Sequence, residues 1–354
     1  MGNVYSEVVQ FQGDHYNFGY MQGNLLKESP ILINRKKQWA SKSRHFLINE
    51  IEFKIVILTF APQIWDEIQG LADSLKWKME DAIREFGGYY LEYGRSGCSI
   101  FTGNEYMVRN YDNHPFSYEG RFTIYRPTDG GYAVIGPSMQ ITGRTDGMNE
   151  KGLAMGYNFI NRKNSEDGFV CNMIGRIILE TCANVDEAID LLKEIPHRHS
   201  FSYVLLDTKG ETFVVEASPR AVEVRQSNVC TNHFEELTEE NRYRMDDSFR
   251  RQQAILQQQN NVTDPYTAYR MMNDTDKGIF SKKYGAWAGT LHTSFYFPQE
   301  MRIGFTLGGD RLPLIFDFNE WMQGEKMKAK RIKGVLDSNM PFINMEEINN
   351  IKHL

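Results

Sequence analysis

The residues whose types and spacing could do chemistry lie in "SGCSIFTGNEYMVRNYD", from Ser96 to Asp112. Cys98 follows Gly97 and opens an alternating segment, which turns at Thr-Gly-Asn and runs on to Arg109 and Asp112. A free cysteine is usually a buried, inert residue, so other features must mark Cys98 as reactive. Gly97 lacks a Cβ atom, which leaves its carbonyl open to the next sulfur and lets its backbone tolerate strain. The junction therefore predicts self-cleavage between Gly97 and Cys98.

Cleavage would make Cys98 an N-terminal residue with a free α-amine. The reference pKa of this amine is about 8, close to about 8.5 for a thiol, so one residue would carry both nucleophile and base. The Arg109 guanidinium favours thiolate, and the Asp112 carboxylate can orient the amine. Strict alternation puts Arg109 and Asp112 on opposite faces of a strand. Both reach Cys98 only if Asp112 lies past the strand end or at a β-bulge.

Histidines offer an alternative base. A papain-like Cys-His hydrolase needs a histidine within hydrogen-bond reach of the Cys98 sulfur, and His114, His233 and His292 are the candidates. The "HRH" at 197–199 supplies two metal ligands at most, which is a weak metal signal. Each of these histidines also fits a structural or surface position.

The elements around Cys98 change type along the chain. Residues 1–97 are predicted to be mostly helical, with apolar residues near helical spacing over 64–86 and a stop at Gly87-Gly88. Strands and tight turns follow from Cys98. A helical pair is expected over about 170–195, with Asn184 as the N-cap of its second helix. Strands then resume, a polar helix is expected over 237–260, and the basic run from Lys326 to Lys333 fits one face of a helix.

This order predicts an α+β fold, because strands joined as hairpins form antiparallel sheets with helices on their outer faces. The chain divides into an N-terminal helical segment, 1–97, and a second segment, 98–354. We expect the two segments to form one integrated domain.

Composition and charge bear on nucleic-acid binding, membrane insertion and the redox state of the cysteines. The net charge of -6 gives no indication of a surface that binds nucleic acid. The most apolar run, "FKIVILTFAP", contains Lys54 and is too short to span a membrane. Four cysteines without a CxxC pair indicate reduced thiols in the cytoplasm. Three of them look like packed small hydrophobes: Cys182 in a helical pattern, and Cys171 and Cys230 in strand-like contexts.

The hairpin "GCSIFTGNEYMVRNYD" resembles the nucleophile hairpin of cysteine-type N-terminal-nucleophile (Ntn) hydrolases. These include choloylglycine (bile salt) hydrolases, penicillin V acylases and the acyl-coenzyme A:6-aminopenicillanic acid acyltransferase family. The resemblance places the nucleophile at Cys98 and the Arg-Asn-x-Asp element at residues 109–112. The turn of this hairpin is shorter than in bile salt hydrolases, so contacts to bile acids are not implied.

Three further motifs extend the resemblance. "DGMNEKGLAMGYNF" is similar to a segment whose late asparagine contacts the oxyanion, which implies Asn158. "NVCTNHF" resembles the Thr-Asn element whose asparagine donates to the oxyanion, which implies Asn232. "DSFRRQQAI" resembles an element that ends in the site arginine, here Arg251 or, one residue earlier, Arg250.

The acyltransferase-like branch fits best, because its members carry a helical segment ahead of a Gly-Cys junction. "YNFGYMQGNLL" and "WDEIQGLADSL" look like the helices of that segment. The resemblance implies a four-layer αββα sandwich built on two antiparallel sheets.

The resemblance implies a self-processing amidohydrolase that cleaves a linear C–N amide bond through a Cys98 acyl-thioester. No metal or organic cofactor is needed. The expected partner is a small N-acyl amide or an acyl-CoA thioester, with no nucleic acid or membrane. Acyl transfer to an amine is the first alternative, and a non-catalytic Ntn-fold binding protein is the second. The sequence leaves open the acyl group, the amine and whether the chain forms a homo-oligomer.

Overall fold

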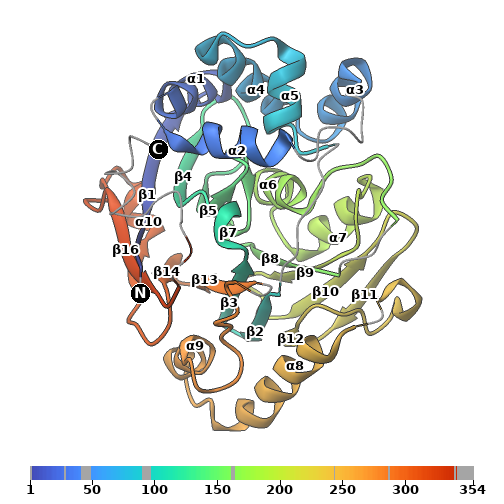
Figure 1. Cartoon of the computed structure of the whole chain (residues 1–354), viewed down its shortest axis with the longest axis vertical. Helices are drawn as coiled ribbons and strands as arrows, with labels where there is room; N and C mark the ends of the chain where they lie inside the picture. The colour runs from blue at the N-terminus through green and yellow to red at the C-terminus, as the bar shows by residue number, and fades with distance from the viewer. Residues whose placement is uncertain are drawn as a thin grey trace.

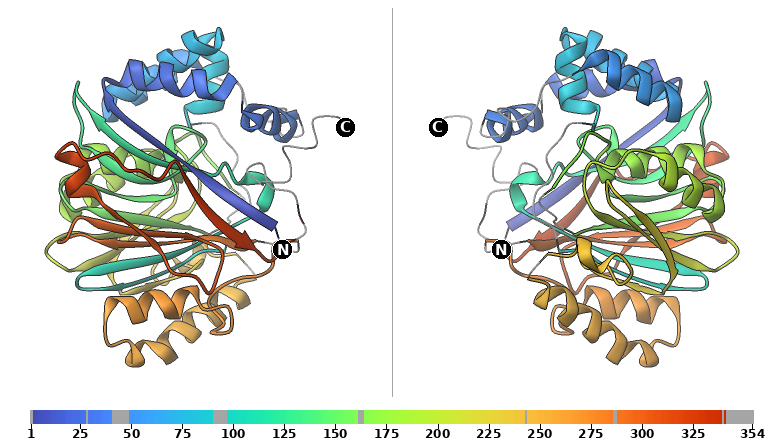
Figure 2. Two further views of the ribbon diagram at one scale, coloured as in Figure 1. Left: turned by 90° about the vertical axis from the view of Figure 1, so that its left-hand side faces the viewer. Right: turned by 90° about the vertical axis from the view of Figure 1, so that its right-hand side faces the viewer.

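A computed structural model describes residues 2–27, 29–40, 49–89, 97–160, 164–242, 244–285, 288–338 and 340. Ser96 of the predicted junction lies outside these ranges, whereas Gly97 and Cys98 lie within them. In this part of the chain the strands form two stacked sheets, and helices cover the outer face of each (Figures 1 and 2).

The larger sheet contains ten strands of the described residues, in the order β11-β10-β9-β8-β7-β5-β4-β1-β16, with β6 paired to β5. Their bounds are β1 (Gly2–Gly13), β4 (Arg121–Pro127), β5 (Val134–Met139), β6 (Gly143–Arg144), β7 (Asp146–Asn149), β8 (Ala154–Phe159), β9 (Phe201–Leu206), β10 (Thr212–Ala217), β11 (Val222–Gln226) and β16 (Arg331–Leu336).

The smaller sheet holds the predicted nucleophile hairpin. Its six strands in the described residues run in the order β12-β2-β3-β13-β14-β15. They are β2 (Ser99–Gly103), β3 (Tyr106–Asn113), β12 (Val229–Cys230), β13 (Gly289–Phe297), β14 (Arg302–Leu307) and β15 (Leu314–Asp317).

Helices form the two outer layers. The N-terminal helices and the pair α6 and α7 cover the larger sheet, and α8 and α9 cover the smaller sheet (Figure 2). The helices are α1 (His15–Lys27), α2 (Pro30–Ala40), α3 (Glu50–Phe60), α4 (Pro62–Leu75), α5 (Met79–Phe86), α6 (Cys171–Thr181), α7 (Val185–Glu194), α8 (Asp246–Gln258), α9 (Pro265–Asn273) and α10 (Phe318–Met322).

Apolar side chains fill the three spaces between these layers. One buried cluster joins the N-terminal helices and α6 to the larger sheet, and a second lies between the sheets and includes Cys98, Ile100 and Tyr111. A third joins the smaller sheet to α8 and α9. The predicted four-layer α+β architecture is thus confirmed, and it places Cys98 on the inner face of the smaller sheet.

Residues 1–97 were predicted to be mostly helical, and this missed β1. Strand β1 pairs in parallel with β4 and antiparallel with β16, so it is an internal strand of the larger sheet. The expectation of purely antiparallel sheets is therefore wrong at one pairing. Because β1 completes a sheet whose other strands lie beyond Cys98, the N-terminal segment is part of the sandwich.

The N-terminal helices are also fixed by close packing and buried charge. Helices α1 and α4 cross where Gly19 and Gly70 lie, and a Cβ on Gly19 would come within 1.9 Å of the Glu67 carbonyl oxygen. Arg176 of α6 donates to the Glu67 carboxylate at 2.7 Å, and both side chains are inaccessible to solvent. Unpairing such a buried charge is strongly destabilising, so this ion pair holds α4 against the second segment.

Three local predictions were wrong. The basic run at 326–333 does not form a helix, since residues 331–336 are strand β16. Cys171 is the first residue of α6, not part of a strand. The polar helix predicted over 237–260 begins only at Asp246. In contrast, Asn184 caps α7 as predicted, because its side chain accepts the Glu187 amide. Among the described helices, none has the length and apolar character needed to cross a membrane.

Candidate active site

Cys98 stands just before β2, with its side chain fully buried between the sheets. Ser99 pairs with Asn110, so the next step of the register places Cys98 beside Tyr111, which in turn pairs with His292. The Arg109 Nη2 atom lies 3.5 Å from the Cys98 sulfur. The thiol is also placed to donate to the Asp112 carbonyl oxygen, at 3.7 Å. The hairpin thus brings both predicted partners to one residue.

Asp112 approaches Cys98 from the other side of the strand. It lies near the end of β3, where the pairing with β13 shifts register between Thr290 and His292. A Cβ placed on Gly97 would lie 3.6 Å from Asp112 Oδ2, and the Gly97 amide donates to the Asp112 carbonyl at 3.4 Å. Arg109 therefore faces the sulfur, while the Asp112 carboxylate lies beside the main chain at the junction. Asp112 lies within β3 and not past its end, so the register shift against β13 meets the β-bulge alternative of the prediction.

The Asp112 carboxyl is harder to ionise than an ordinary aspartate while the chain is uncut. Burial raises its pKa to about 7, against the opposing effects of the Arg251 charge and a hydrogen bond from Thr290. Thr290 Oγ1 donates to Asp112 Oδ1 at 2.6 Å. An ammonium group next to this carboxyl would favour its ionised form. The site is thus suited to hold the α-amine that cleavage would create.

Arg251 links α8 to Cys98 and to the first residue of β2. Its Nη1 atom donates to the Cys98 carbonyl oxygen and, at 2.6 Å, to Ser99 Oγ. Its Nε atom donates to Asp247 at 3.0 Å. Arg250, the other candidate of the motif, is partly exposed and donates to the Gly278 carbonyl. The geometry therefore favours Arg251 as the site arginine, holding the main chain of Cys98.

Both candidate asparagines are buried and donate to main-chain carbonyls. Asn232 Oδ1 accepts from Arg251 Nη2 at 2.8 Å, and its Nδ2 donates to the Phe159 carbonyl at 2.8 Å. Asn158 Nδ2 donates to the Cys230 carbonyl at 3.0 Å. Each side-chain amide thus already donates one of its two hydrogens to a main-chain carbonyl. A role at the oxyanion would use the second hydrogen, and Asn232 also contacts Arg251, which holds the Cys98 carbonyl.

The candidate histidines contact other groups. His233 Nδ1 lies 2.8 Å from Ser248 Oγ, and burial lowers its pKa to about 4. His292 stacks on Tyr111, with 4.9 Å between ring centroids, and its Nε2 atom faces Asp146 at 3.3 Å. Burial lowers the pKa of His114. Among the residues that the structure describes, no group of three or more His, Cys, Asp or Glu side chains could hold a metal ion.

Two residues of the site were missed by sequence reasoning. Asp146 accepts a hydrogen bond from Arg109 Nη1 at 2.7 Å, and Thr290 holds Asp112 as described above. Asp146 is the first residue of the segment "DGMNEKG", which carries the family resemblance. Its place in this motif could therefore have marked it as a candidate site residue. Nothing in the local sequence marks Thr290, whose contact with Asp112 spans 178 residues.

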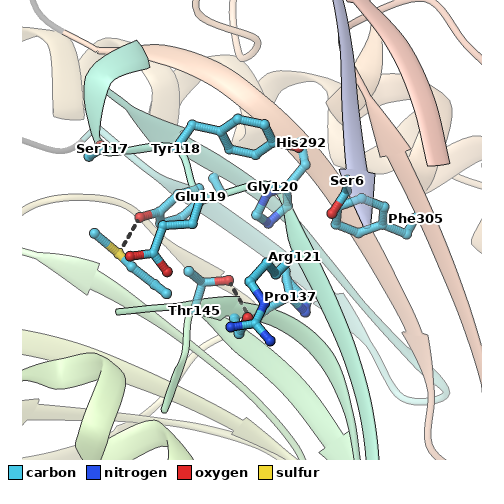
Figure 3. A pocket seen from close by; sticks show the side chains of 13 residues that line it. Ser6, Ser117, Tyr118, Glu119, Gly120, Arg121, Pro137, Thr145, His292 and Phe305 are labelled. Atoms are coloured by element: carbon cyan, nitrogen blue, oxygen red, sulfur yellow. Dashed lines mark hydrogen bonds between the residues drawn. The ribbon is translucent and has the colours of Figure 1, made fainter. Parts of the chain in front are cut away.

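A small cavity is lined in part by His292 and by Tyr111, the residue that the strand register places beside Cys98 (Figure 3). Tyr118, His292 and Phe305 lie on one side of it, and Pro137 and Thr145 on the other. Its volume is about 10 Å³, which suits about one water molecule. This cavity is too small to hold an acyl group.

Comparisons with known proteins place the chain in a family. No curated protein sequence matches it significantly. Among solved structures, a mutant of the conjugated bile acid hydrolase from Clostridium perfringens has a TM-score of 0.47 and 16% identity, covering 64% of this chain and 93% of its own. Penicillin V acylase from Agrobacterium tumefaciens has a TM-score of 0.42 and 17% identity, covering 62% and 84%. The Caenorhabditis elegans ortholog of N-acylethanolamine-hydrolyzing acid amidase has a TM-score of 0.39 and 11% identity, covering 57% and 92%.

The family model described as acyl-coenzyme A:6-aminopenicillanic acid acyl-transferase matches residues 101–312. This range is more than half of the chain and contains Arg109, Asp112, Asn232 and Arg251, and it begins just after Cys98. The chain belongs to the acyl-coenzyme A:6-aminopenicillanic acid acyl-transferase family.

Proposed function

We propose that this protein is a self-processing amidohydrolase that cleaves a linear amide bond through a thioester on Cys98. The observation that carries the proposal is the placing of Arg109 beside the Cys98 sulfur and of the Asp112 carboxylate beside Gly97. A thiol, a cation next to it and an anion next to its future α-amine are the groups that terminal-nucleophile catalysis requires.

In the maturation step, the Cys98 sulfur attacks the carbonyl carbon of Gly97. The S–C bond forms, the C–N bond to Cys98 breaks, and the thiol proton passes to the departing nitrogen. The product is a thioester between Gly97 and the Cys98 side chain, with a free α-amine. Water then attacks the thioester, which yields the Gly97 carboxylate and restores the thiol. Arg251 holds the Cys98 carbonyl in place during both steps.

Turnover of a substrate repeats this chemistry on an external amide. The α-amine of Cys98 takes the thiol proton while the sulfur attacks the acyl carbonyl, and the amine then gives the proton to the leaving nitrogen. Asp112 holds the ammonium form, and Asn232 is our candidate donor to the oxyanion. Loss of one such donor typically costs about 10²–10³ in rate. Water releases the acyl group from the thioester.

Acyl transfer is the second candidate, and the family membership favours it. An amine in place of water would accept the acyl group from the same Cys98 thioester, and an acyl-CoA thioester could supply that group. Hydrolysis and transfer share every residue discussed here and differ only in the second nucleophile. Product analysis with and without an added amine acceptor separates them.

The proposed location is the cytoplasm. The four cysteines are free and buried, which suits a reducing compartment. The proposed partner is a small N-acyl amide or acyl-CoA.

Intact-mass spectrometry of the purified protein tests the proposal. We expect two segments of 97 and 257 residues from the wild-type chain and one full-length chain from the Cys98→Ala variant. Amidase activity should appear only in the cut sample. An uncut wild-type chain with intact activity would refute self-processing, and an uncut chain without activity would support the non-catalytic binding alternative.

A further inference from the structure

Arg109 crosses the space between the sheets and ends in a socket on the larger sheet. Its Nη1 atom donates to Asp146 Oδ1 at 2.7 Å, and its Nη2 atom donates to the Tyr157 carbonyl oxygen. The same Nη2 atom lies 3.5 Å from the Cys98 sulfur. The side chains of Arg109 and Asp146 are both inaccessible to solvent. The guanidinium thus bridges the Asp146 carboxylate and the thiol of the nucleophile.

Asp146 is itself held firmly. Tyr296 donates its hydroxyl to Asp146 Oδ2 at 2.6 Å, and Thr145 donates to Oδ1 at 2.7 Å. Burial alone would raise the pKa of Asp146, but the Arg109 charge and the His292 hydrogen bond outweigh burial and hold that pKa well below its usual range. The carboxylate therefore stays ionised and rigid, and it compensates the buried guanidinium.

The socket also depends on a missing side chain. Gly156 of β8 pairs with Asp146 of β7. A Cβ on Gly156 would lie 2.9 Å from Arg109 Cδ, so the glycine leaves the room that Arg109 occupies. The rings of Tyr111 and Tyr157 lie 4.8 and 5.0 Å from the guanidinium carbon, which completes the walls with favourable cation–π contacts.

We propose that Asp146 is a positioning residue of the Cys98 site, which fixes Arg109 beside the sulfur and takes up part of the guanidinium charge. The inference rests on the proposed role of Cys98 as the nucleophile. Asp146 would act through Arg109, because Arg109 touches both groups. By sharing the charge, Asp146 would limit how strongly Arg109 acidifies the thiol, and a less acidic thiol is the stronger nucleophile once ionised.

Several titratable or charged groups face this pair or Cys98 and must be considered in any pH experiment. They come from β3, β8, α8 and β13: Tyr111, Asp112, Tyr157, Arg251, His292 and Tyr296. None of these residues is altered in the charge-changing variants described next, so differences between variants in the same cleavage state, which intact mass establishes, report on Arg109 and Asp146.

The test is a titration of the Cys98 thiol by the ultraviolet absorbance of its thiolate, taken as the difference from the Cys98→Ser variant. Asp146→Asn keeps the shape and removes the compensating charge, so the thiol pKa should fall by about one unit or more. Arg109→Met should raise it. The thiol pKa of the double variant should lie between those of the two single variants. Because the double variant removes both buried charges together, it can be titrated even if Asp146→Asn alone folds poorly.

Tyr296→Phe is the matched control, since it removes one hydrogen bond to Asp146 without changing any charge, and its thiol pKa should stay near that of the wild type. An unchanged or raised thiol pKa in folded Asp146→Asn would overturn the proposal. This titration needs neither cleavage nor turnover, so a wild-type chain that stays uncut would count against the proposed function without affecting this result.

Discussion

Asp112→Asn should make the uncut chain more stable at neutral pH. In the matured protein, the same substitution should abolish most activity. Burial raises the pKa of Asp112 to about 7 from its usual value of 3.8. Between these values the folded chain binds a proton that the unfolded chain has released, so stability falls as pH rises through this window. At 1.36 kcal/mol per pKa unit, ionising Asp112 costs about 4 kcal/mol of stability once the pH is well above 7. Asparagine carries no such cost.

The assay is urea unfolding across the pH range in a Cys98→Ala background, which keeps every sample uncut. Below about pH 4 the background chain and its Asp112→Asn variant should have similar free energies of unfolding, and above pH 7 the variant should be the more stable. In the matured protein, Asp112→Asn should lower kcat by about 10² or more, because the α-amine loses its orienting anion. The reasoning fails if the variant is less stable at pH 8 than its background, or if matured Asp112→Asn retains full activity.

Three further predictions concern the rest of the molecule. Because β1 is an internal strand of the larger sheet, the two segments should remain together after cleavage, as a single species in native mass spectrometry; separation without denaturant would contradict this. Burial lowers the pKa of His15, but the nearby Glu180 carboxylate outweighs burial, so the net pKa shift is upward. The protonated His15 therefore stabilises the fold below its unfolded pKa, and this stabilisation is lost as the pH rises through its folded pKa. Urea midpoints should show this fall as the pH rises above about 6.5, and His15→Gln should remove it. His114→Ala and His233→Ala should retain most activity in steady-state assays, whereas one inactive but folded variant would favour the Cys-His mechanism.

The hairpin at Cys98 could be predicted from the sequence because its contacts are local. Arg109 and Asp112 return on the strand next to β2, so one turn brings both near Cys98, although alternation alone did not predict the register shift that lets Asp112 reach it. The contact between Arg251 and the Cys98 carbonyl spans 153 residues, and no spacing rule reaches that far. Only the family resemblance pointed to Arg251. Thr290 had neither a local pattern nor a motif.

The missed strands have a physical explanation as well. In β1, the polar residues Ser6 and Gln10 occur among apolar ones, and its partners β4 and β16 lie far along the chain. In β16 the charged Arg331 and Lys333 alternate with buried Ile332 and Gly334, which is the period of an edge strand rather than of a helix. The spacing of the basic residues was therefore interpreted as one face of a helix, although the period of two over 331–334 indicates a strand.

The position of β1 has a consequence for the order of events during synthesis. The twelve residues of β1 are synthesised well before those of its partner β16, which lies at 331–336. Pairings between such distant residues form slowly and late in folding. Arg251 and Thr290, which support the junction, also follow Cys98 by more than 150 residues. Under the proposed self-processing, the Gly97–Cys98 bond should become reactive only after β16 has been synthesised and paired, which would protect shorter nascent chains from premature cleavage.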